Sequence, residues 1–479
     1  MELVAEGSDS NVQHAVIIAA GAGVRFGEST QSLPKPVLTV AGISLIARTI
    51  YTAKKAGIRY FTVVTGYEAE TLEAYLRQPV FPGVHIQCVR NEKWQRANGL
   101  SVLKARGKVQ GQFVLLMADH LFEAGIVKRL LASPLPNGYC RLAVDFNLQN
   151  ILDLDDATRV HVANGRILTI GKNIQSYNAI DTGIFFGSHA LFEALDTAIS
   201  KGEESLSAGI QELAQDLRME AVDIGDLFWQ DIDNERDRKE GERRLLQTLV
   251  NETDSWLTRK INRKISLTLT HHLARTRIGP NHITFFSFSL GLMGAGCMLW
   301  GTYFGFLMGS ALFLASSILD GCDGEIARLK FQETHLGAWL DVITDNLTHF
   351  ALFSCMSVGL IVGSGSTLYA LPGALLVTGS VASFFMAVVA QKRVSKDHGL
   401  IFSTSRVADI QDGSGRYPRN HLSIWLDRFA NRDFAYLLLV LSCINRTGWF
   451  LWIAGMGAPM FALLFYRTLT YGGTNRKMP

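Results

Sequence analysis

Residues 15–25 read AVIIAAGAGVR, an apolar run that leads into a glycine-rich turn and an arginine. Two further apolar runs, Tyr60–Thr65 and Phe113–Met117, have the length and composition of buried parallel strands. Between the runs lie stretches with the spacing of amphipathic helices, at residues 45–56 and 68–77. This alternation predicts a doubly wound, Rossmann-like α/β domain, whose ligands collect beyond the carboxyl ends of its strands.

The composition of the whole chain excludes some classes of protein. Its 479 residues are too many for one compact core, and 48% of them are apolar whereas only 19% are charged. The formal charge of +3 indicates no nucleic-acid partner. The six cysteines form no C-x-x-C pair and are expected to be reduced packing residues. Residues 1–12 form a polar tail without the features of a signal peptide, so the N-terminus is expected to stay in the cytoplasm.

The composition changes sharply after Asp254, because no Asp or Glu follows until Asp320. The predicted α/β domain therefore covers residues 13–240, and residues 280–479 form a second domain. Most apolar segments of the second domain reach or approach the ~20 residues that a helix needs to cross a bilayer. They predict an all-α domain of six transmembrane helices, of which the second and fifth are short. The segments are His282–Gly301, Phe304–Leu319, Ala338–Val362, Thr367–Ala390, Phe434–Ile444 and Gly448–Tyr466.

The segment between the two domains, residues 241–279, is predicted to contain a helix that lies on an anionic membrane surface. Apolar residues recur every four positions along it, with basic residues between them. The apolar set is Leu257, Ile261, Ile265, Leu269 and Leu273, and the basic set is Arg259, Lys260, Arg263 and Lys264. More basic residues concentrate in the connection Gln391–Asp433. The positive-inside rule then puts this connection and the α/β domain in the cytoplasm, and the chain is expected to be a multi-pass protein of the cell membrane.

The glycine-rich turn has the chemistry of a phosphate site. Gly21 and Gly23 let backbone N–H groups approach phosphate oxygens closely, and Arg25 and Lys35 can neutralise a triphosphate. The turn has neither the third glycine of a dinucleotide fingerprint nor the Gly-Lys-Ser/Thr of a P-loop. Instead, A-A-G-x-G-x-R followed by P-K-P resembles the signature of nucleotidyltransferases that make sugar nucleotides and CDP-alcohols. The resemblance implies nucleotide binding by Ala20, Gly21 and Gly23, and catalytic roles for Arg25 and Lys35.

The same resemblance implies a Mg²⁺ ion between two carboxylates. Asp119 follows the strand Phe113–Met117, and Asp233 lies near the end of the domain, with Asp231 as its substitute. A helix cap is the alternative role for Asp119.

The resemblance to these nucleotidyltransferases also implies roles for three further residues. Asn98 stands where related enzymes contact the base, and an asparagine there resembles the cytidylyltransferases, which points to CTP. Lys172 and Asp181 lie in segments similar to those that border the acceptor pocket of inositol-phosphate cytidylyltransferases, where they would meet the phosphate and the hydroxyl groups. A surface lysine and a turn aspartate are the alternatives.

Four carboxylates mark the second domain. Asp320 and Asp323 are three residues apart and Asp341 and Asp345 are four apart, so each pair shares one face of a helix. Four uncompensated carboxylates beside lipid would cost several kcal/mol each, so they require neutralisation. Divalent cations bound through oxygen provide it, and a two-metal cluster can clamp a phosphate during an in-line displacement.

The pattern D-x-x-D-G-x-x-A-R, eight residues, and G-x-x-x-D-x-x-x-D resembles the signature of the CDP-alcohol phosphotransferases, a family with six membrane helices. The resemblance implies that the four carboxylates bind Mg²⁺, with Mn²⁺ as an alternative, and that Asp345 is also the base. It implies that a CDP site is lined by Gly324, Ala327, Arg328 and Gly337. It also implies a homodimer formed through the membrane domain.

The two resemblances thus imply that one half makes a CDP-linked alcohol and that the other consumes one, so the first product can be the second donor. The whole chain resembles bifunctional inositol-1-phosphate cytidylyltransferase and di-myo-inositol-phosphate-phosphate synthases. This implies CTP, inositol 1-phosphate, CDP-inositol and the lipid bilayer as partners. Candidate cations for the phosphate of the second acceptor are Arg275, Arg277, Lys392, Arg393 and Arg432.

Two other functions stay open at this stage. One is a phospholipid synthase that uses CDP-diacylglycerol and a polar alcohol phosphate. The other is a cation transporter with a regulatory nucleotide-binding domain, which the lack of an internal repeat disfavours.

Overall fold

The computed structural model describes residues 12–23, 25–26, 33–79, 81–250, 256–394 and 433–471. Internal contacts divide the chain into two compact units, Met1–Thr248 and Leu249–Pro479. The first unit is an α/β domain and the second is helical.

The first unit is built on a nine-stranded sheet with the order β5-β4-β1-β6-β11-β8-β12-β10-β9. The first four strands in this order run parallel to one another, as the apolar runs predict. The antiparallel strand β11 (Ala179–Gly187) then joins them to a mixed second half, which the sequence did not predict. The remaining strands are β1 (His14–Ala19), β4 (Tyr60–Thr65), β5 (His85–Arg90), β6 (Phe113–Met117), β8 (Cys140–Asp145), β9 (Arg159–Ala163), β10 (Arg166–Gly171) and β12 (Met219–Asp223).

Strand β1 is central, because it lies between β4 and β6. Ala15, Val16 and Ile17 are fully buried, as expected for a parallel strand covered on both faces. The register pairs Ile18 of β1 with Met117 of β6. Both strands therefore end at the same edge of the sheet, where their carboxyl ends position the residues that follow.

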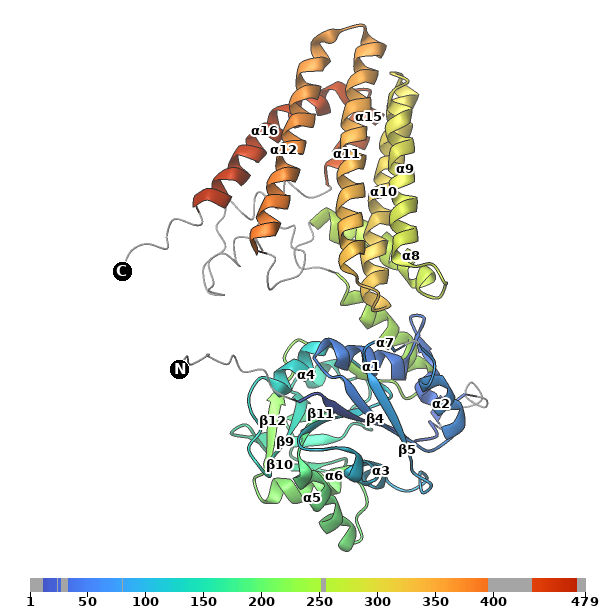
Figure 1. Cartoon of the computed structure of the whole chain (residues 1–479), viewed down its shortest axis with the longest axis vertical. Coiled ribbons are helices and arrows are strands. Elements are labelled where there is room, and N and C mark those ends of the chain that lie inside the picture. The colour runs from blue at the N-terminus through green and yellow to red at the C-terminus, as the bar shows by residue number, and fades with distance from the viewer. Residues whose placement is uncertain are drawn as a thin grey trace, which may run out of the picture. The chain divides into compact units, whose positions relative to one another are not determined.

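Helices cover both faces of the sheet (Figure 1). One hydrophobic core lies under α1 (Leu45–Lys55), α2 (Ala69–Leu76) and α4 (Ala124–Leu131). The other lies under α3 (Asn98–Lys104), α5 (His189–Ser200) and α6 (Leu206–Gln215). The prediction of a Rossmann-like domain is therefore confirmed. Several short elements complete the part of this unit that bears on the site. They are helix α7 (Glu235–Gln247), the turn η2 (Lys35–Val37), the strand pair β2 (Thr39–Val40) with β3 (Ile43–Ser44), and the strand pair β7 (His120–Phe122) with β13 (Trp229–Asp231).

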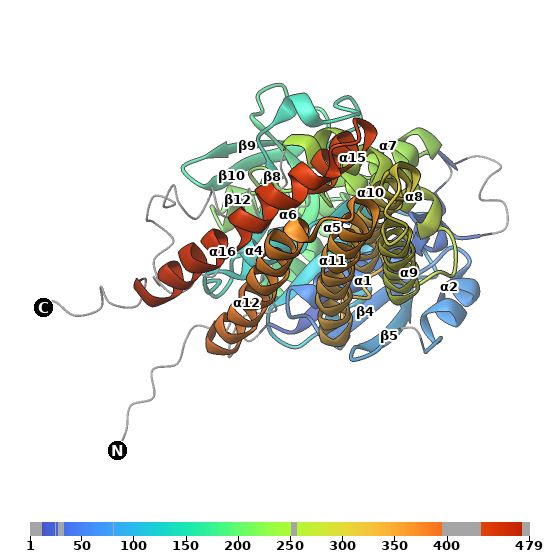
Figure 2. The same cartoon turned by 90° about the horizontal axis from the view of Figure 1, so that it is seen from above.

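The second unit is a bundle of helices (Figure 2). Four of its described helical segments are long and apolar enough to cross a membrane: Tyr303–Leu329, His335–Ser364, Thr367–Met386 and Thr447–Leu464. Helix α9 (Pro280–Met298) has 19 residues but does not meet the combined criterion of length and hydropathy. Helix α15 (Phe434–Cys443) has only ten residues. A helical membrane domain is thus supported, whereas six crossings stay a prediction. The helices are α8 (Arg263–Ala274), α9 (Pro280–Met298), α10 (Tyr303–Leu329), α11 (His335–Ser364), α12 (Ala370–Val394), α15 (Phe434–Cys443) and α16 (Thr447–Tyr471).

Close packing of α9 on α10 depends on small residues. A Cβ atom on Gly294 would lie 2.8 Å from the carbonyl oxygen of Gly309, and one on Gly309 would lie 2.6 Å from that of Gly294. Side chains at these positions would force the helices apart. The contact fixes α9 beside the helix that carries two of the four predicted metal ligands.

Helix α8 and the π-helical turn before it, η5 (Thr258–Asn262), occupy the predicted membrane-surface helix. Ile261 and Ile265 of the apolar stripe are exposed, which agrees with a face that meets lipid. Arg263 departs from the prediction of a purely membrane-facing basic set. Its guanidinium lies 2.6 Å from the buried carboxylate of Glu325 on α10, because an ionised carboxylate away from water requires a cation.

Candidate active sites

The first site lies where β1 and β6 end. The chain passes from β1 through Ala20 into the glycine-rich turn, and from β6 through Ala118 to Asp119. A cavity of about 240 Å³ opens there. It brings together six of the residues predicted for the nucleotide and metal site, although they come from distant segments. Its lining residues are Ile18, Ala19, Gly21, Gly23, Arg25, Lys35, Pro36, Ala118, Asp119 and Asp233.

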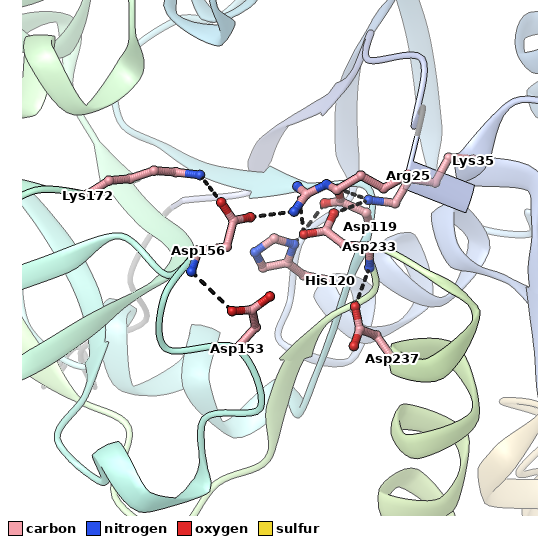
Figure 3. A network of polar contacts seen from close by, with 9 residues as sticks. All are labelled: Arg25, Lys35, Asp119, His120, Asp153, Asp156, Lys172, Asp233 and Asp237. Atoms are coloured by element: carbon pink, nitrogen blue, oxygen red, sulfur yellow. Dashed lines mark hydrogen bonds and ion pairs between the residues drawn. The ribbon is translucent and has the colours of Figure 1, made fainter. Parts of the chain in front are cut away.

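Lys35 is the centre of this site (Figure 3). Its Nζ atom lies 2.6 Å from Oδ2 of Asp119 and 2.8 Å from Oδ1 of Asp233, and its side chain is only 8% exposed. Gly23 makes room for it: its φ is +62°, and a Cβ atom there would lie 2.7 Å from Cβ of Lys35. The turn therefore needs glycine at this position both for its backbone conformation and for the passage of the lysine stem.

Opposite charges keep these groups ionised. Burial by itself would raise the pKa of Asp119, but Lys35 and His120 hold it well below its usual range. Burial would likewise lower the pKa of Lys35, but Asp119 and Asp233 raise it. The site thus presents an ionised Asp119 beside a protonated Lys35 at neutral pH.

Two more cations, Arg25 and Lys172, extend this network of ion pairs toward the predicted acceptor pocket. Nη2 of Arg25 lies 2.9 Å from Oδ2 of Asp233, and Nη1 of Arg25 pairs with Asp156. The other oxygen of Asp156 pairs with Nζ of Lys172 (Figure 3). Sequence reasoning missed Asp156, because nothing in its own neighbourhood marks it. It is identified only by the two predicted cations that it joins.

His120 was also missed, although it directly follows a predicted ligand. Its Nδ1 lies 2.8 Å from Oδ1 of Asp119, and its ring stacks on Trp229 with centroids 6.1 Å apart. Gly183, at φ +70°, lets the ring approach, since a Cβ there would lie 2.6 Å from Nε2. His120 therefore holds the carboxylate of Asp119 in one orientation through this hydrogen bond.

The remaining predicted residues of the first unit have defined contacts. Asp181 accepts a hydrogen bond of 2.7 Å from the backbone N–H of Gly183, and burial raises its pKa to about 6. Burial also raises the pKa of Asp231. Oδ1 of Asn98 accepts a hydrogen bond of 2.9 Å from the N–H of Leu206 at the start of α6. The predicted contact of Asn98 with a base stays a prediction.

The second site lies in the helical unit. Asp320 and Asp323 of α10 and Asp341 of α11 each offer a carboxylate oxygen, and these atoms all lie within 4.8 Å of one another. Asp320 and Asp323 are buried. Asp345 does not belong to this cluster of three. It lies one turn farther along α11 and lines a cavity of about 10 Å³ together with Asp320. Its roles as fourth ligand and base stay predictions.

Both halves match known families. Residues 15–208 match the MobA-like NTP transferase domain, and residues 277–414 match the CDP-alcohol phosphatidyltransferase family. A bifunctional IPC transferase and DIPP synthase of Aquifex aeolicus is 31% identical over 351 residues, which are 73% of this chain and 78% of that protein. One of Rubrobacter xylanophilus is 33% identical over 374 residues, or 76% and 82%.

The chain belongs to the bifunctional IPC transferase and DIPP synthase family. The prediction of this family, and of an enzyme with cytidylyltransferase and CDP-alcohol phosphotransferase domains, is therefore confirmed. An inositol-1-phosphate CTP transferase from T. maritima also aligns, with a TM-score of 0.43 and 27% identity over 47% of this chain and 91% of that one.

Families with these two domains use divalent metal ions, and the donor sets of this chain fit them. Asp119 and Asp233 point one oxygen each at a common position, now taken by Nζ of Lys35. In the second unit three carboxylates meet. Carboxylate oxygens are the ligands that hard divalent cations prefer.

The predicted CDP-site residues lie between Asp323 and Asp341 in the sequence. Gly324 and Ala327 lie on α10, and a Cβ atom on Gly324 would lie 3.5 Å from Nη1 of Arg328. Arg328 also donates a hydrogen bond of 3.3 Å to the carbonyl of Leu249. The N–H of Gly337 donates to Oγ1 of Thr334, which caps α11.

The second-acceptor cations are less well defined. Arg275 and Arg277 are exposed after α8. Arg432 and the side chains of Lys392 and Arg393 lie outside the described residues. All five stay predictions.

Proposed function

We propose that this chain makes di-myo-inositol phosphate phosphate in two successive transfers. In the first, CTP and inositol 1-phosphate give CDP-inositol and pyrophosphate. In the second, CDP-inositol and another inositol 1-phosphate give the phosphodiester and CMP. One observation carries the proposal: a cation-lined cavity at the ends of β1 and β6 and a cluster of three carboxylates occur on one chain of this family.

The first transfer is assigned to the cavity of the first unit. A phosphate oxygen of inositol 1-phosphate attacks the α-phosphorus of CTP, and the bond to the β-phosphate breaks to release pyrophosphate. Arg25 and Lys35 neutralise the negative charge that develops on the transferring and leaving phosphates. Ala20, Gly21 and Gly23 allow the triphosphate to approach the backbone. Mg²⁺ held by Asp119 and Asp233, with Asp231 as substitute, would supply further charge neutralisation when bound.

Substrate selection in this transfer is assigned to three residues. Asn98 contacts the cytosine base. Lys172 binds the phosphate of inositol 1-phosphate, and Asp181 accepts hydrogen bonds from its hydroxyl groups. Support comes from Asp156, which links Lys172 to Arg25 and so puts the acceptor cation beside the catalytic one.

The second transfer is assigned to the helical unit. A hydroxyl of the second inositol phosphate attacks the β-phosphorus of CDP-inositol, Asp345 accepts the hydroxyl proton, and CMP leaves. The residues Gly324, Ala327, Arg328 and Gly337 bind the CDP group. Mg²⁺ or Mn²⁺ held by Asp320, Asp323, Asp341 and Asp345 would stabilise the charge on the pyrophosphate bridge when bound.

The chain is organised, in this proposal, as a nucleotidyltransferase domain at residues 13–240, a linker with the membrane-surface helix at 241–279, and a membrane domain at 280–479. The helical unit crosses the membrane six times and forms a homodimer. The nucleotidyltransferase domain lies in the cytoplasm. The four apolar helices support membrane association, and the basic connection Gln391–Asp433 supports the orientation.

Mass analysis of products tests the function. Purified full-length protein in detergent is supplied with CTP, Mg²⁺ and inositol 1-phosphate. We expect pyrophosphate, CMP and the inositol phosphodiester. Consumption of CTP only with phosphocholine or glycerol phosphate, or formation of a lipid product only with CDP-diacylglycerol, would contradict the proposal and favour a phospholipid synthase.

A further inference from the structure

Glu325 is a buried carboxylate that neither transfer uses. It lies on α10 within the carboxylate motif, between Gly324 and Ile326, and is 0% exposed. Successive residues of a helix are rotated by about 100°. Glu325 therefore points away from the face on which Asp320 and Asp323 meet Asp341, and it is not in the described metal-type cluster.

Both oxygens of Glu325 bind side chains of the membrane-surface helix. Nη1 of Arg263 lies 2.6 Å from Oε1, and the hydroxyl of Ser266 donates to the same oxygen at 2.7 Å. The hydroxyl of Thr270 donates to Oε2 at 2.7 Å. A carboxylate without water is stable only when it is paired and hydrogen-bonded in this way.

These contacts belong to a buried stripe of α8 and the turn before it. Asn262, Ser266, Thr270 and Ala274 recur every four residues and are all buried. Asn262 accepts a hydrogen bond from the hydroxyl of Tyr436 on α15, and the carbonyl of Ser266 accepts one from Sγ of Cys322 at 3.6 Å. The apolar residues Ile261 and Ile265 are exposed instead. Polar contacts thus attach this segment to α10 and, through Asn262, to α15.

The opposite side of α10 is held by α9. Oγ1 of Thr284 donates a hydrogen bond of 2.5 Å to Oδ2 of Asp323. Helix α10 is therefore hydrogen-bonded to α9 through Asp323 and to α8 through Glu325, two residues farther along. Because a helix rotates as a rigid unit, the bond network of Glu325 limits the rotation that would move Asp320 and Asp323 relative to Asp341.

We infer that Glu325 is a positioning residue of the second active site: through Arg263, Ser266 and Thr270 it locks the rotation of α10, and so sets the spacing of the metal-binding carboxylates. The inference rests on the proposed role of those carboxylates in the second transfer. It adds a function for α8, which is to hold the metal-binding helix as well as to lie on the membrane.

Metal binding in full-length variants tests the inference. Binding of Mn²⁺ is measured by electron paramagnetic resonance in an Asp119→Asn, Asp233→Asn background, which weakens the first site. Glu325→Gln keeps the size of the side chain and removes its charge. We expect it to weaken Mn²⁺ binding roughly 10- to 100-fold, the usual effect of losing a partner that orients metal ligands. With an otherwise unchanged chain, the Mn²⁺ concentration for half-maximal CMP release from CDP-inositol should rise by a similar factor.

Matched variants separate positioning from general destabilisation. Thr270→Val removes one bond to Glu325, whereas Thr268→Val changes an exposed threonine of the same helix. Only the first should weaken Mn²⁺ binding. Arg263→Lys, which keeps the charge, should retain more binding than Arg263→Met. If Glu325→Gln does not fold, the Thr270 and Thr268 pair decides in its place.

Two results would overturn the inference. One is unchanged Mn²⁺ binding in Glu325→Gln and Thr270→Val. The other is a lower melting temperature and less CMP release with the same metal dependence, which would mean a purely structural role. Failure of the unmodified chain to release CMP from CDP-inositol would contradict the proposed function, but the comparison of Mn²⁺ binding would still decide the role of Glu325.

Discussion

The Nζ atom of Lys35 lies 2.6 Å from Oδ2 of Asp119, although 84 residues separate them in sequence. The lysine is thereby bound to a carboxylate that the proposed function assigns to a metal ion. It also lies in the cavity that the glycine-rich turn lines.

Replacement of this lysine should affect only the first transfer. We expect Lys35→Ala to lower pyrophosphate release from CTP and inositol 1-phosphate by roughly 100-fold or more, because it removes a charge aimed at the transferring phosphate. CMP release from supplied CDP-inositol should not change. Coupled assays of pyrophosphate and CMP on the same sample check this, and equal loss of both activities in folded protein would contradict the division of labour.

The reverse pattern is expected for a carboxylate of the helical unit. Asp323→Asn should abolish CMP release, since Asp323 is buried within the cluster of three carboxylates. Pyrophosphate release should continue at the rate of the unmodified chain. The same two assays measure it, and persistent CMP release would exclude Asp323 from the reaction.

The turn should tolerate no side chain at Gly23. Gly23→Ala requires an alanine at φ +62° and a Cβ atom 2.7 Å from Cβ of Lys35. We expect loss of pyrophosphate release by at least about tenfold, because Lys35 must move. Gly107→Ala is the matched control, as a Cβ atom there meets nothing within 4 Å. Equal activity of the two variants would contradict the close passage of Lys35.

Replacement of Lys172 should weaken binding of inositol 1-phosphate, whereas replacement of Asp156 should not. Lys172→Ala is expected to raise KM for inositol 1-phosphate by about tenfold, because a charge-assisted bond to the phosphate is lost. Asp156→Ala removes the carboxylate that competes for Lys172 and Arg25, so KM should fall or stay the same. Steady-state kinetics with varied inositol 1-phosphate measure both, and a higher KM in Asp156→Ala would contradict this reading.

Acceptor binding should weaken in acid. Burial raises the pKa of Asp181 to about 6, so the carboxyl is protonated below that pH and accepts fewer hydrogen bonds from hydroxyl groups. KM for inositol 1-phosphate should therefore rise as the pH falls through 6. The phosphate itself titrates near pH 6. Asp181→Asn is the control, because only the phosphate of the substrate still titrates in this variant. If its KM depends on pH in the same way as that of the unmodified chain, Asp181 is not the group whose titration weakens acceptor binding.

Some features of this protein follow from the sequence by itself. The strands Tyr60–Thr65 and Phe113–Met117 were predicted to the residue, because parallel strands buried on both faces appear as short continuous apolar runs. The shared face of Asp320 and Asp323 also followed from spacing, since residues three or four apart lie on one side of a helix, whereas the approach of Asp341 depends on how α11 packs. These are local patterns, and local patterns determine which face of an element is buried or polar.

Other features were decided only by the tertiary structure. Asp156 binds Arg25 across 131 residues of sequence, and Glu325 binds Arg263 across 62. The antiparallel insertion of β11 beside β6 is likewise a long-range pairing. Such contacts depend on how distant segments pack, and a short charged side chain carries no periodicity that reveals its partner. The sequence alone therefore predicted the two enzyme families, whereas the folded chain decided which charges lie beside the candidate residues.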